Sequence, residues 1–110
     1  MVLEHAVIDV RPGTGGQFEE SVVEARSVIA ASHGFISLHL HRGIEAPDRY
    51  LLLVEWETLD DHVVGFRQSD AFTRWRVLIG PYFASPPVVD HLSPVDAVGP
   101  GPGVEQEDAS

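Results

Sequence analysis

The chain has 110 residues, the usual size of one domain, and its 44% hydrophobic and 22% charged residues are typical of a globular protein. It contains no cysteine and no lysine, which excludes disulfides, thiolate catalysis, cysteine-ligated metals and lysine Schiff-base chemistry. The formal net charge of −10 argues against a nucleic-acid-binding protein, because phosphate recognition requires clustered cations.

The first predicted elements are a strand and an amphipathic helix. Residues 2–10 alternate as a strand does, with Val2, Ala6, Ile8 and Val10 on one face and Leu3, His5, Val7 and Asp9 on the other. Residues 14–17 match a capping box, so we expect a helix to begin there. Gly34 suits the left-handed position that follows a helix. The apolar face of this helix consists of Phe18, Val22, Ala25 and Ile29.

Two further strands follow, joined by a loop over residues 43–48. The second strand, residues 35–42, carries Ile36, Leu38 and Leu40 on one face and Ser37, His39 and His41 on the other. Residues 50–57 form the third strand, and its apolar run from Tyr50 to Val54 predicts burial on both faces of the sheet.

Two short helices and a last strand complete the predicted order. Thr58 and Ser69 are good N-caps for consecutive helices. Their apolar positions are Leu59, Val63 and Phe66 in the first helix and Phe72, Trp75 and Ile79 in the second. Gly80-Pro81 ends the second helix, and residues 87–92 form a short strand. Residues 94–110 are rich in Pro, Gly and acidic residues, so we predict a disordered tail after an ordered domain of residues 1–93.

The order strand, helix, strand, strand, helix pair, strand predicts an α+β, ferredoxin-like β-α-β-β-α-β fold. Its four-stranded antiparallel sheet would be covered by helices on one face only. Because the third strand is apolar on both faces, we expect a second copy of the chain to cover the other face, giving a homodimer. No apolar run approaches the roughly 20 residues that span a bilayer, and no signal peptide is visible. We therefore expect a cytoplasmic protein with no membrane partner.

Three segments together resemble the antibiotic biosynthesis monooxygenase family: Tyr50-Leu-Leu-Leu-Val-Glu-Trp56, Phe66-Arg-Gln-Ser-Asp-Ala-Phe72 followed by Trp75, and Gly80-Pro81-Tyr-Phe83. The resemblance covers roughly residues 2–92 and implies a dimeric α/β-barrel with a ligand cavity between the helices and the sheet of each subunit. The best-known members of that family oxygenate polycyclic phenols or quinols with molecular oxygen and need no metal or flavin. The resemblance therefore implies no cofactor. Other members degrade haem or isomerise small metabolites, so the family alone does not fix the activity.

The haem-degrading branch of the family has a residue pattern that this sequence does not share. That pattern has an Asn on the first strand, a Trp just before the Ser-x-x-Phe helix and a ligating His within that helix. The corresponding positions here are Ala6, Phe66 and Arg76. Haem degradation is therefore disfavoured, with His62 left as an alternative ligand.

Aromatic residues gather on one side of the helix pair, facing the first strand. This pattern allows two interpretations: ordinary core packing, or the walls of a cavity that binds a flat aromatic ligand. The residues that follow the second helix would close the cavity mouth or simply pack. The candidate ligand-binding residues are Phe66, Phe72, Trp75, Tyr82 and Phe83.

His62 and Arg76 are the candidate catalytic residues. A neutral His62 in the cavity would remove a phenolic proton, and Arg76 would stabilise the resulting oxyanion. The alternatives are a surface histidine on a short helix and a solvated arginine paired with Asp70 or Asp61.

His39 and His41 form a His-x-His pair on one strand face, which His5 and Glu55 would share in a ferredoxin-like sheet. Imidazoles and a carboxylate are suitable ligands for a divalent metal. Because this face is the expected subunit interface, we favour a polar contact between these residues and predict no metal site.

The sequence thus predicts a cofactor-independent monooxygenase that oxidises a phenolic or quinol-type aromatic. The alternative is a non-catalytic or stress-response dimer whose cavity binds a small apolar ligand.

Overall fold

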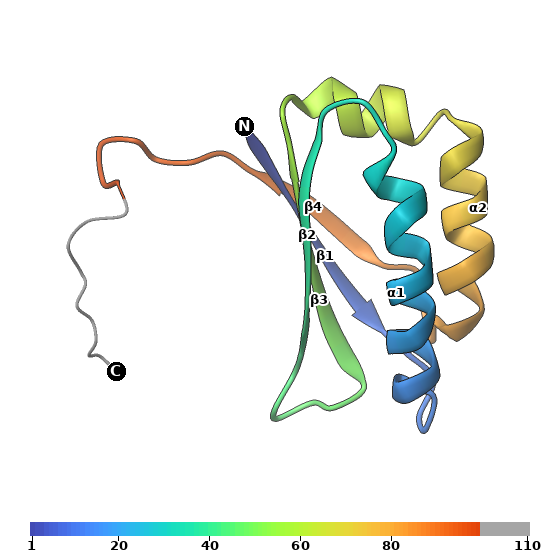
Figure 1. Ribbon diagram of the computed structural model, residues 1–110. Coiled ribbons are helices and arrows are strands. Elements are labelled where there is room, and N and C mark those ends of the chain that lie inside the picture. The colour runs from blue at the N-terminus through green and yellow to red at the C-terminus, as the bar shows by residue number, and fades with distance from the viewer. Residues whose placement is uncertain (100–110) are drawn as a thin grey trace.

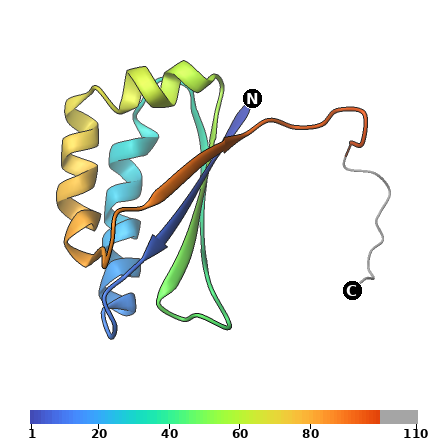
Figure 2. The same cartoon turned by 180° about the vertical axis from the view of Figure 1, so that it is seen from behind.

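The computed structural model describes residues 1–99, and its strands form one antiparallel sheet in the order β2-β3-β1-β4. The two long helices lie side by side on one face of this sheet (Figures 1 and 2). This confirms the predicted ferredoxin-like α+β fold. The elements in chain order are β1 (Val2–Asp9), α1 (Gly15–Ala30), β2 (Phe35–Arg42), β3 (Arg49–Trp56), the π-helical η1 (Asp61–Phe66), α2 (Asp70–Ile79), the short 3-10 helix η2 (Gly80–Tyr82) and β4 (Val88–Leu92).

The core lies between the sheet and the helices, and strand alternation determines which residues enter it. The four apolar positions predicted for α1 are all buried. In β1 and β3 every second residue is buried: Glu4, Ala6 and Ile8 in the first strand, and Tyr50, Leu52, Val54 and Trp56 in the second. The intervening residues of both strands are half-buried even without a partner on the outer face, apart from exposed Arg49.

The helix ends follow the sequence in part. Gly34 has a φ of +81°, and an added Cβ there would collide with the Asp61 carboxylate, so glycine is required on two grounds. Ser69 caps α2 by accepting a hydrogen bond from the Phe72 N–H at 3.3 Å. The predicted capping box of α1 is wrong: Thr14 Oγ1 instead donates to the Arg11 carbonyl at 2.6 Å, which stabilises the preceding turn.

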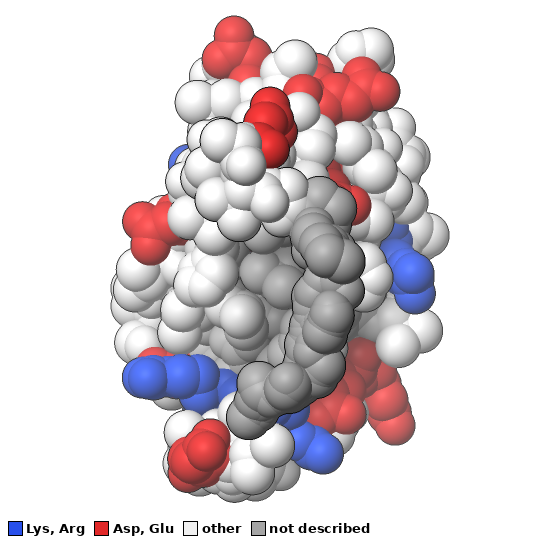
Figure 3. Space-filling model, turned by 90° about the vertical axis from the view of Figure 1, so that its left-hand side faces the viewer, with Lys and Arg blue, Asp and Glu red and all other residues white. Residues whose placement is uncertain are grey.

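The other face of the sheet carries no helix. Its apolar side chains come from three strands and comprise Leu3, Val7, Leu51, Leu53, Val88 and Leu92, all half-buried or exposed. Figure 3 shows this face, with acidic and basic side chains mainly around its edge. Beyond β4, residues 93–99 form no helix or strand and leave the sheet on this side (Figure 1). The predicted tail lies outside the described residues from residue 100 onward.

No helix in the described part of the chain is both long enough and apolar enough to cross a membrane.

Candidate active site

A cavity of about 610 Å³ lies on the helix-covered side of the sheet, between α2 and the strands β1 and β4. Its walls are mostly apolar and include Ile8, Leu52, Phe66, Phe72, Trp75 and Phe83. Three of these aromatic rings meet edge to face, with Phe66 at 5.4 Å from Phe72 and 6.2 Å from Trp75, centroid to centroid. The cavity is large enough for a ligand of several fused rings, since small-molecule sites typically measure roughly 300–1,000 Å³.

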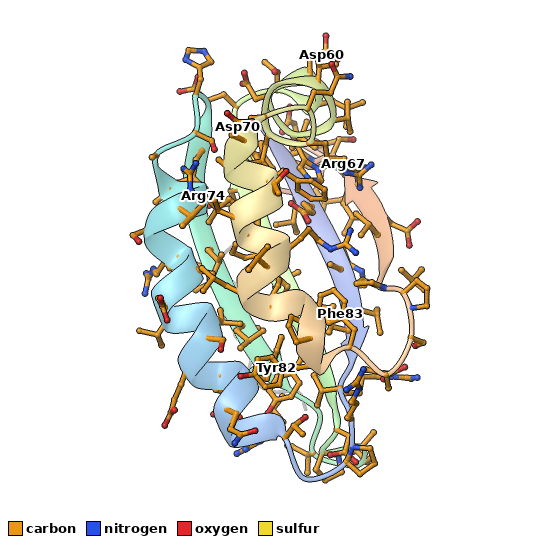
Figure 4. All side chains as sticks on the ribbon, turned by 90° about the vertical axis from the view of Figure 1, so that its right-hand side faces the viewer. Asp60, Arg67, Asp70, Arg74, Tyr82 and Phe83 are labelled. Carbon is orange, nitrogen blue, oxygen red and sulfur yellow. The ribbon has the colours of Figure 1, made fainter. Side chains whose placement is uncertain are left out.

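The structure brings together six of the seven residues that we predicted for the site. Phe66, Phe72, Trp75, Phe83, His62 and Arg76 line the cavity. Tyr82 does not. Its ring packs against Phe18, with the centroids 6.3 Å apart, and its hydroxyl accepts a hydrogen bond from Ser21 Oγ at 3.4 Å. Figure 4 shows Tyr82 between α1 and α2, whereas Phe83 lies on the β4 side of α2.

His62 is buried, so the alternative of a surface histidine is wrong. The π-helical turn η1 directs both His62 and Phe66 toward the sheet, and His62 is only 2% exposed. Its ring stacks on the Trp56 indole at 5.2 Å between centroids, with 15° between the ring planes. Single π-helical turns occur often at functional sites, because they redirect side chains within a helix.

The two ring nitrogens of His62 both have partners. Nδ1 lies 2.8 Å from Nε2 of His91 on β4, a hydrogen-bond distance. Nε2 lies 3.3 Å from Oε1 of Glu4 on β1. The same Glu4 oxygen accepts a hydrogen bond from the Trp56 indole N–H at 3.0 Å. Side chains from β1, β3, η1 and β4 therefore meet at one polar cluster beside the cavity.

Burial changes the proton affinity of this cluster. Burial, followed by the positive charge of Arg67, lowers the pKa of His62 to about 4. Burial also raises the pKa of Glu4 above its usual value, although the Trp56 hydrogen bond and Arg67 favour the charged form. The pKa of His91 is lowered, again mainly by burial. His62 is therefore neutral at neutral pH.

Two arginines line the cavity together with Glu4. Arg76 places its guanidinium 5.7 Å from the centroid of the Phe72 ring, a cation–π distance. It forms no ion pair within residues 1–99, so the expected pairing with Asp70 or Asp61 is wrong. Arg67 follows η1, and Figure 4 shows its side chain near the end of β4.

The strand histidines of the outer face do not come together as a metal site. Ser37 Oγ donates to Glu55 at 2.6 Å, while His39 and His5 lie on opposite sides of Leu53. Within the described residues, only His33, Glu57 and Asp61 place three potential ligand atoms close together. This group is largely exposed, and Asp61 accepts a hydrogen bond from the Thr58 N–H at 3.2 Å, which is a capping interaction.

The cavity residues do not suit haem. The three positions expected from the haem-degrading pattern are occupied by Ala6, Phe66 and Arg76, which line the cavity without offering an axial ligand. His62, the alternative ligand, has each ring nitrogen within 3.3 Å of Glu4 or His91.

Glu4, Trp56 and His91 belong to the site but were not predicted from the sequence. One signal was present but was not used: Glu4 has the strand phase of Ala6 and Ile8, which places a carboxylate among buried side chains. A buried carboxylate requires polar partners. Nothing local to Trp56 or His91 identified them as those partners, because their contacts with Glu4 and His62 arise only in the folded chain.

Comparisons with known proteins agree with this fold. Residues 1–77 match the family described as antibiotic biosynthesis monooxygenase. The uncharacterized protein YczJ of Bacillus subtilis is 37% identical over 95 residues, which cover 86% of this chain and 100% of that protein. The crystal structure of a Bordetella bronchiseptica protein described as an antibiotic biosynthesis monooxygenase superposes with a TM-score of 0.84. It is 48% identical, and the match covers 86% of this chain and 96% of that chain.

A more distant structure shows the same fold with a ligand. The monooxygenase from the gene ActVA-Orf6 of Streptomyces coelicolor, in complex with nanaomycin D, superposes with a TM-score of 0.73. Its identity is 18%, and the match covers 84% of this chain and 86% of that chain. At this identity the similarity shows the fold alone.

Proposed function

Because the chain belongs to the antibiotic biosynthesis monooxygenase family, we propose that it is a cofactor-independent monooxygenase that oxidises a phenolic or quinol-type aromatic with molecular oxygen. The observation that carries this proposal is the cavity itself: an apolar, aromatic-walled chamber with one buried acid–base cluster and two cationic side chains. Flat rings pack well against Phe66, Phe72 and Trp75, and a chamber with few polar groups keeps water from reactive intermediates.

The reaction begins with removal of the phenolic proton by the cluster that contains His62. The substrate O–H bond breaks, and its electron pair remains on oxygen as a phenolate. Arg76 stabilises this oxyanion by charge-assisted hydrogen bonding. The electron-rich phenolate ring reduces molecular oxygen and combines with it to form a peroxide. Loss of water from the peroxide leaves one oxygen atom on the ring as a quinone, so the substrate supplies all four electrons.

We also propose that the working form is a homodimer that buries the outer face of the sheet. The six apolar side chains on that face meet solvent in a single subunit. A second copy would cover them with an identical surface, as a two-fold interface does. The outer-face residues His5, His39, His41 and Glu55 would then contribute polar contacts at the interface.

A second candidate function is ligand binding without catalysis. It is favoured by the pKa of His62, which at about 4 makes the imidazole a weak base at neutral pH. Such a protein would hold a small aromatic or apolar molecule in the same cavity.

Turnover of a hydroquinone panel with and without oxygen tests the oxygenase. We expect metal-free protein to consume 1,4-naphthohydroquinone aerobically, with incorporation of one labelled oxygen atom from ¹⁸O₂, and to leave it unchanged anaerobically. Equal rates under both conditions, or no turnover of any quinol, would contradict an oxygenase.

A double variant distinguishes the enzyme from the binding protein. His62→Ala combined with Arg76→Ala should abolish turnover if the protein is an oxygenase, whereas a binding protein should keep most of its affinity for 1,4-naphthoquinone. Arg74→Ala is the matched control, because Arg74 lies on the same helix but does not line the cavity.

A further inference from the structure

A row of polar side chains runs from the cavity wall to the edge of the sheet. Trp56 donates to Glu4, Glu4 contacts His62 at 3.3 Å, and His62 lies 2.8 Å from His91. The strand register holds two members of this row close to each other, because Glu4 on β1 is directly opposite His91 on the edge strand β4. We call Glu4, His62 and His91 the proton chain.

The two inner members of the proton chain are buried, and the outer one is more exposed. Glu4 is 7% exposed and His62 2%, and both line the cavity. His91 is half-buried and does not line the cavity. The proton chain therefore joins Glu4, which lines the cavity, to His91, which is partly exposed to solvent outside the cavity.

His62 has no nitrogen free to bind a ligand, but Glu4 has a free oxygen. Both His62 nitrogens face protein partners, at 2.8 Å and 3.3 Å. On Glu4, the contacts from Trp56 and His62 both reach Oε1, and none of the hydrogen bonds within residues 1–99 reaches Oε2. A buried carboxylate oxygen without a donor is costly unless a ligand or water supplies one.

We propose that Glu4, rather than His62, takes the proton of the bound ligand, and that His62 and His91 conduct that proton between Glu4 and solvent. This inference rests on the proposed function for the identity of the ligand, a phenol or quinol. The hydroxyl group of the ligand donates to Oε2, and the proton chain lets the carboxyl group exchange its proton without water entering the cavity. Glu4 is the catalytic residue, and His62 and His91 are positioning residues that act through it.

Two arrangements of protons satisfy the contacts of the chain. In the first, Glu4 is a carboxylate, His62 carries its proton on Nε2 and donates toward Glu4, and His91 donates from Nε2 to Nδ1 of His62. In the second, Glu4 is a carboxylic acid: rotation of the carboxyl group has brought the proton taken from the ligand to the oxygen that faces Nε2 of His62, and both imidazoles carry their proton on Nδ1. The second holds one proton more than the first. Loss of that proton from Nδ1 of His91 to water moves one proton along each contact and restores the first.

Burial is the largest effect on Glu4 and raises its pKa, whereas the Trp56 N–H and Arg67 favour the first arrangement in the empty protein. Trp56 is a donor only, so its N–H stabilises the carboxylate form of Glu4. Arg67 acts in the same direction and also disfavours a proton on His62 or His91, while Asp90 favours protonation of His91.

Nitrogen-15 NMR of the empty protein tests the chain without any substrate. At neutral pH we expect His62 to be neutral, with its proton on Nε2, and this preference should weaken in His91→Gln. His33→Ala is the control, because His33 is an exposed histidine that does not belong to the proton chain. A His62 that carries its proton on Nδ1, or one whose tautomer is unaffected by His91→Gln, would overturn the proposal even if the protein proves to be an oxygenase.

Kinetics then separate the roles. Glu4→Gln should lower kcat at least roughly 100-fold with little change in KM, as expected for loss of a general base. His91→Gln should lower kcat only about tenfold, and added imidazole should restore it, because a small proton carrier replaces a relay. Full activity of Glu4→Gln would overturn the role of Glu4 and leave the oxygenase intact. Absence of turnover in the wild type would contradict the oxygenase and leave the NMR result to decide the proton chain.

Discussion

The two halves of the helix-covered face differ although they share one sheet. Under α1 the core around Phe18 is closely packed: this side chain is fully buried, and its ring lies 4.9 Å from that of Tyr50, centroid to centroid. A more open groove of about 440 Å³ lies beside it, between α1 and β2. Under α2 the same sheet borders a cavity of about 610 Å³. Helix α1 buries four of its 16 residues, and α2 buries Trp75 and Ile79 among its 10. The buried residues of α1 close the core over β3, whereas the shorter α2 leaves room for a ligand over β1 and β4.

The largest expected effect is on stability under α1. Phe18→Ala should cost about 3–5 kcal/mol of unfolding free energy, because it removes a fully buried ring from a well-packed region. Phe72→Ala, at the cavity wall, should cost less than about half as much, since that ring is half-buried and already borders empty space. Urea unfolding followed by circular dichroism measures both. Equal losses would remove the distinction between the two halves.

The pH dependence of stability is the next largest effect, and it comes from the α2 side. His62 has a folded pKa of about 4 against an ordinary value of 6.5, so the unfolded chain binds a proton that the folded chain refuses between these values. As pH falls from 6.5 to 4, His62 should therefore reduce stability, by up to about 3 kcal/mol. Glu4 has the opposite slope, because its raised pKa makes the folded form lose stability as pH rises above 4.5.

The contribution of His62 is isolated by a difference. Glu4 is present in both the wild type and His62→Gln, so its contribution is common to the two unfolding free energies. The wild-type value minus the His62→Gln value should therefore decrease as pH falls from 6.5 to 4, because only the wild type contains His62. His33→Ala, at an exposed site, should show no such trend. A flat difference between wild type and His62→Gln would mean that His62 is not buried in its neutral form.

The region under α1 could be predicted from the sequence better than the region under α2. The α1 stripe and the strand alternation are local periodic signals, and they placed the α1, β1 and β3 residues on the correct face. The prediction for Ile36 in β2 is wrong: a β-bulge between Phe35 and Ser37 leaves it 47% exposed, and Phe35 packs against the core instead.

Of the seven residues predicted for the cavity, only Tyr82 does not line it, and its neighbour Phe83 points the other way (Figure 4). Two adjacent residues after a helix have no periodicity to separate them. Glu4 and Arg67 line the cavity without having been predicted. The Glu4, His62 and His91 contacts were not predictable, because they depend on strand register and on the π-helical turn.

The open face of the sheet is a third region, with neither a helix nor a cavity over it, and it gives a smaller expected effect. Leu53→Glu places a charge in the middle of the proposed dimer interface, between His5 and His39. We expect it to weaken self-association at least about tenfold, or roughly 1.4 kcal/mol, as measured by sedimentation equilibrium. Val23→Glu is the control, because Val23 is 74% exposed on α1. A wild-type protein that remains a folded monomer at micromolar concentration would contradict the dimer.

The smallest effects come from the boundary between the α1 side and the α2 side. Tyr82 and Phe83 are adjacent there, but Tyr82 packs on the α1 side and Phe83 lines the cavity. Tyr82→Phe removes only the hydroxyl that accepts a weak hydrogen bond from Ser21, so it should cost at most about 1 kcal/mol of stability and leave ligand affinity unchanged. Phe83→Leu should leave stability nearly unchanged and weaken binding of 1,4-naphthoquinone several-fold, because a flat ring at the cavity wall is lost. Fluorescence titration of both variants measures the affinities. If Tyr82→Phe weakened binding as much as Phe83→Leu, the ligand would have to extend between α1 and α2, and Tyr82 would belong to the binding site.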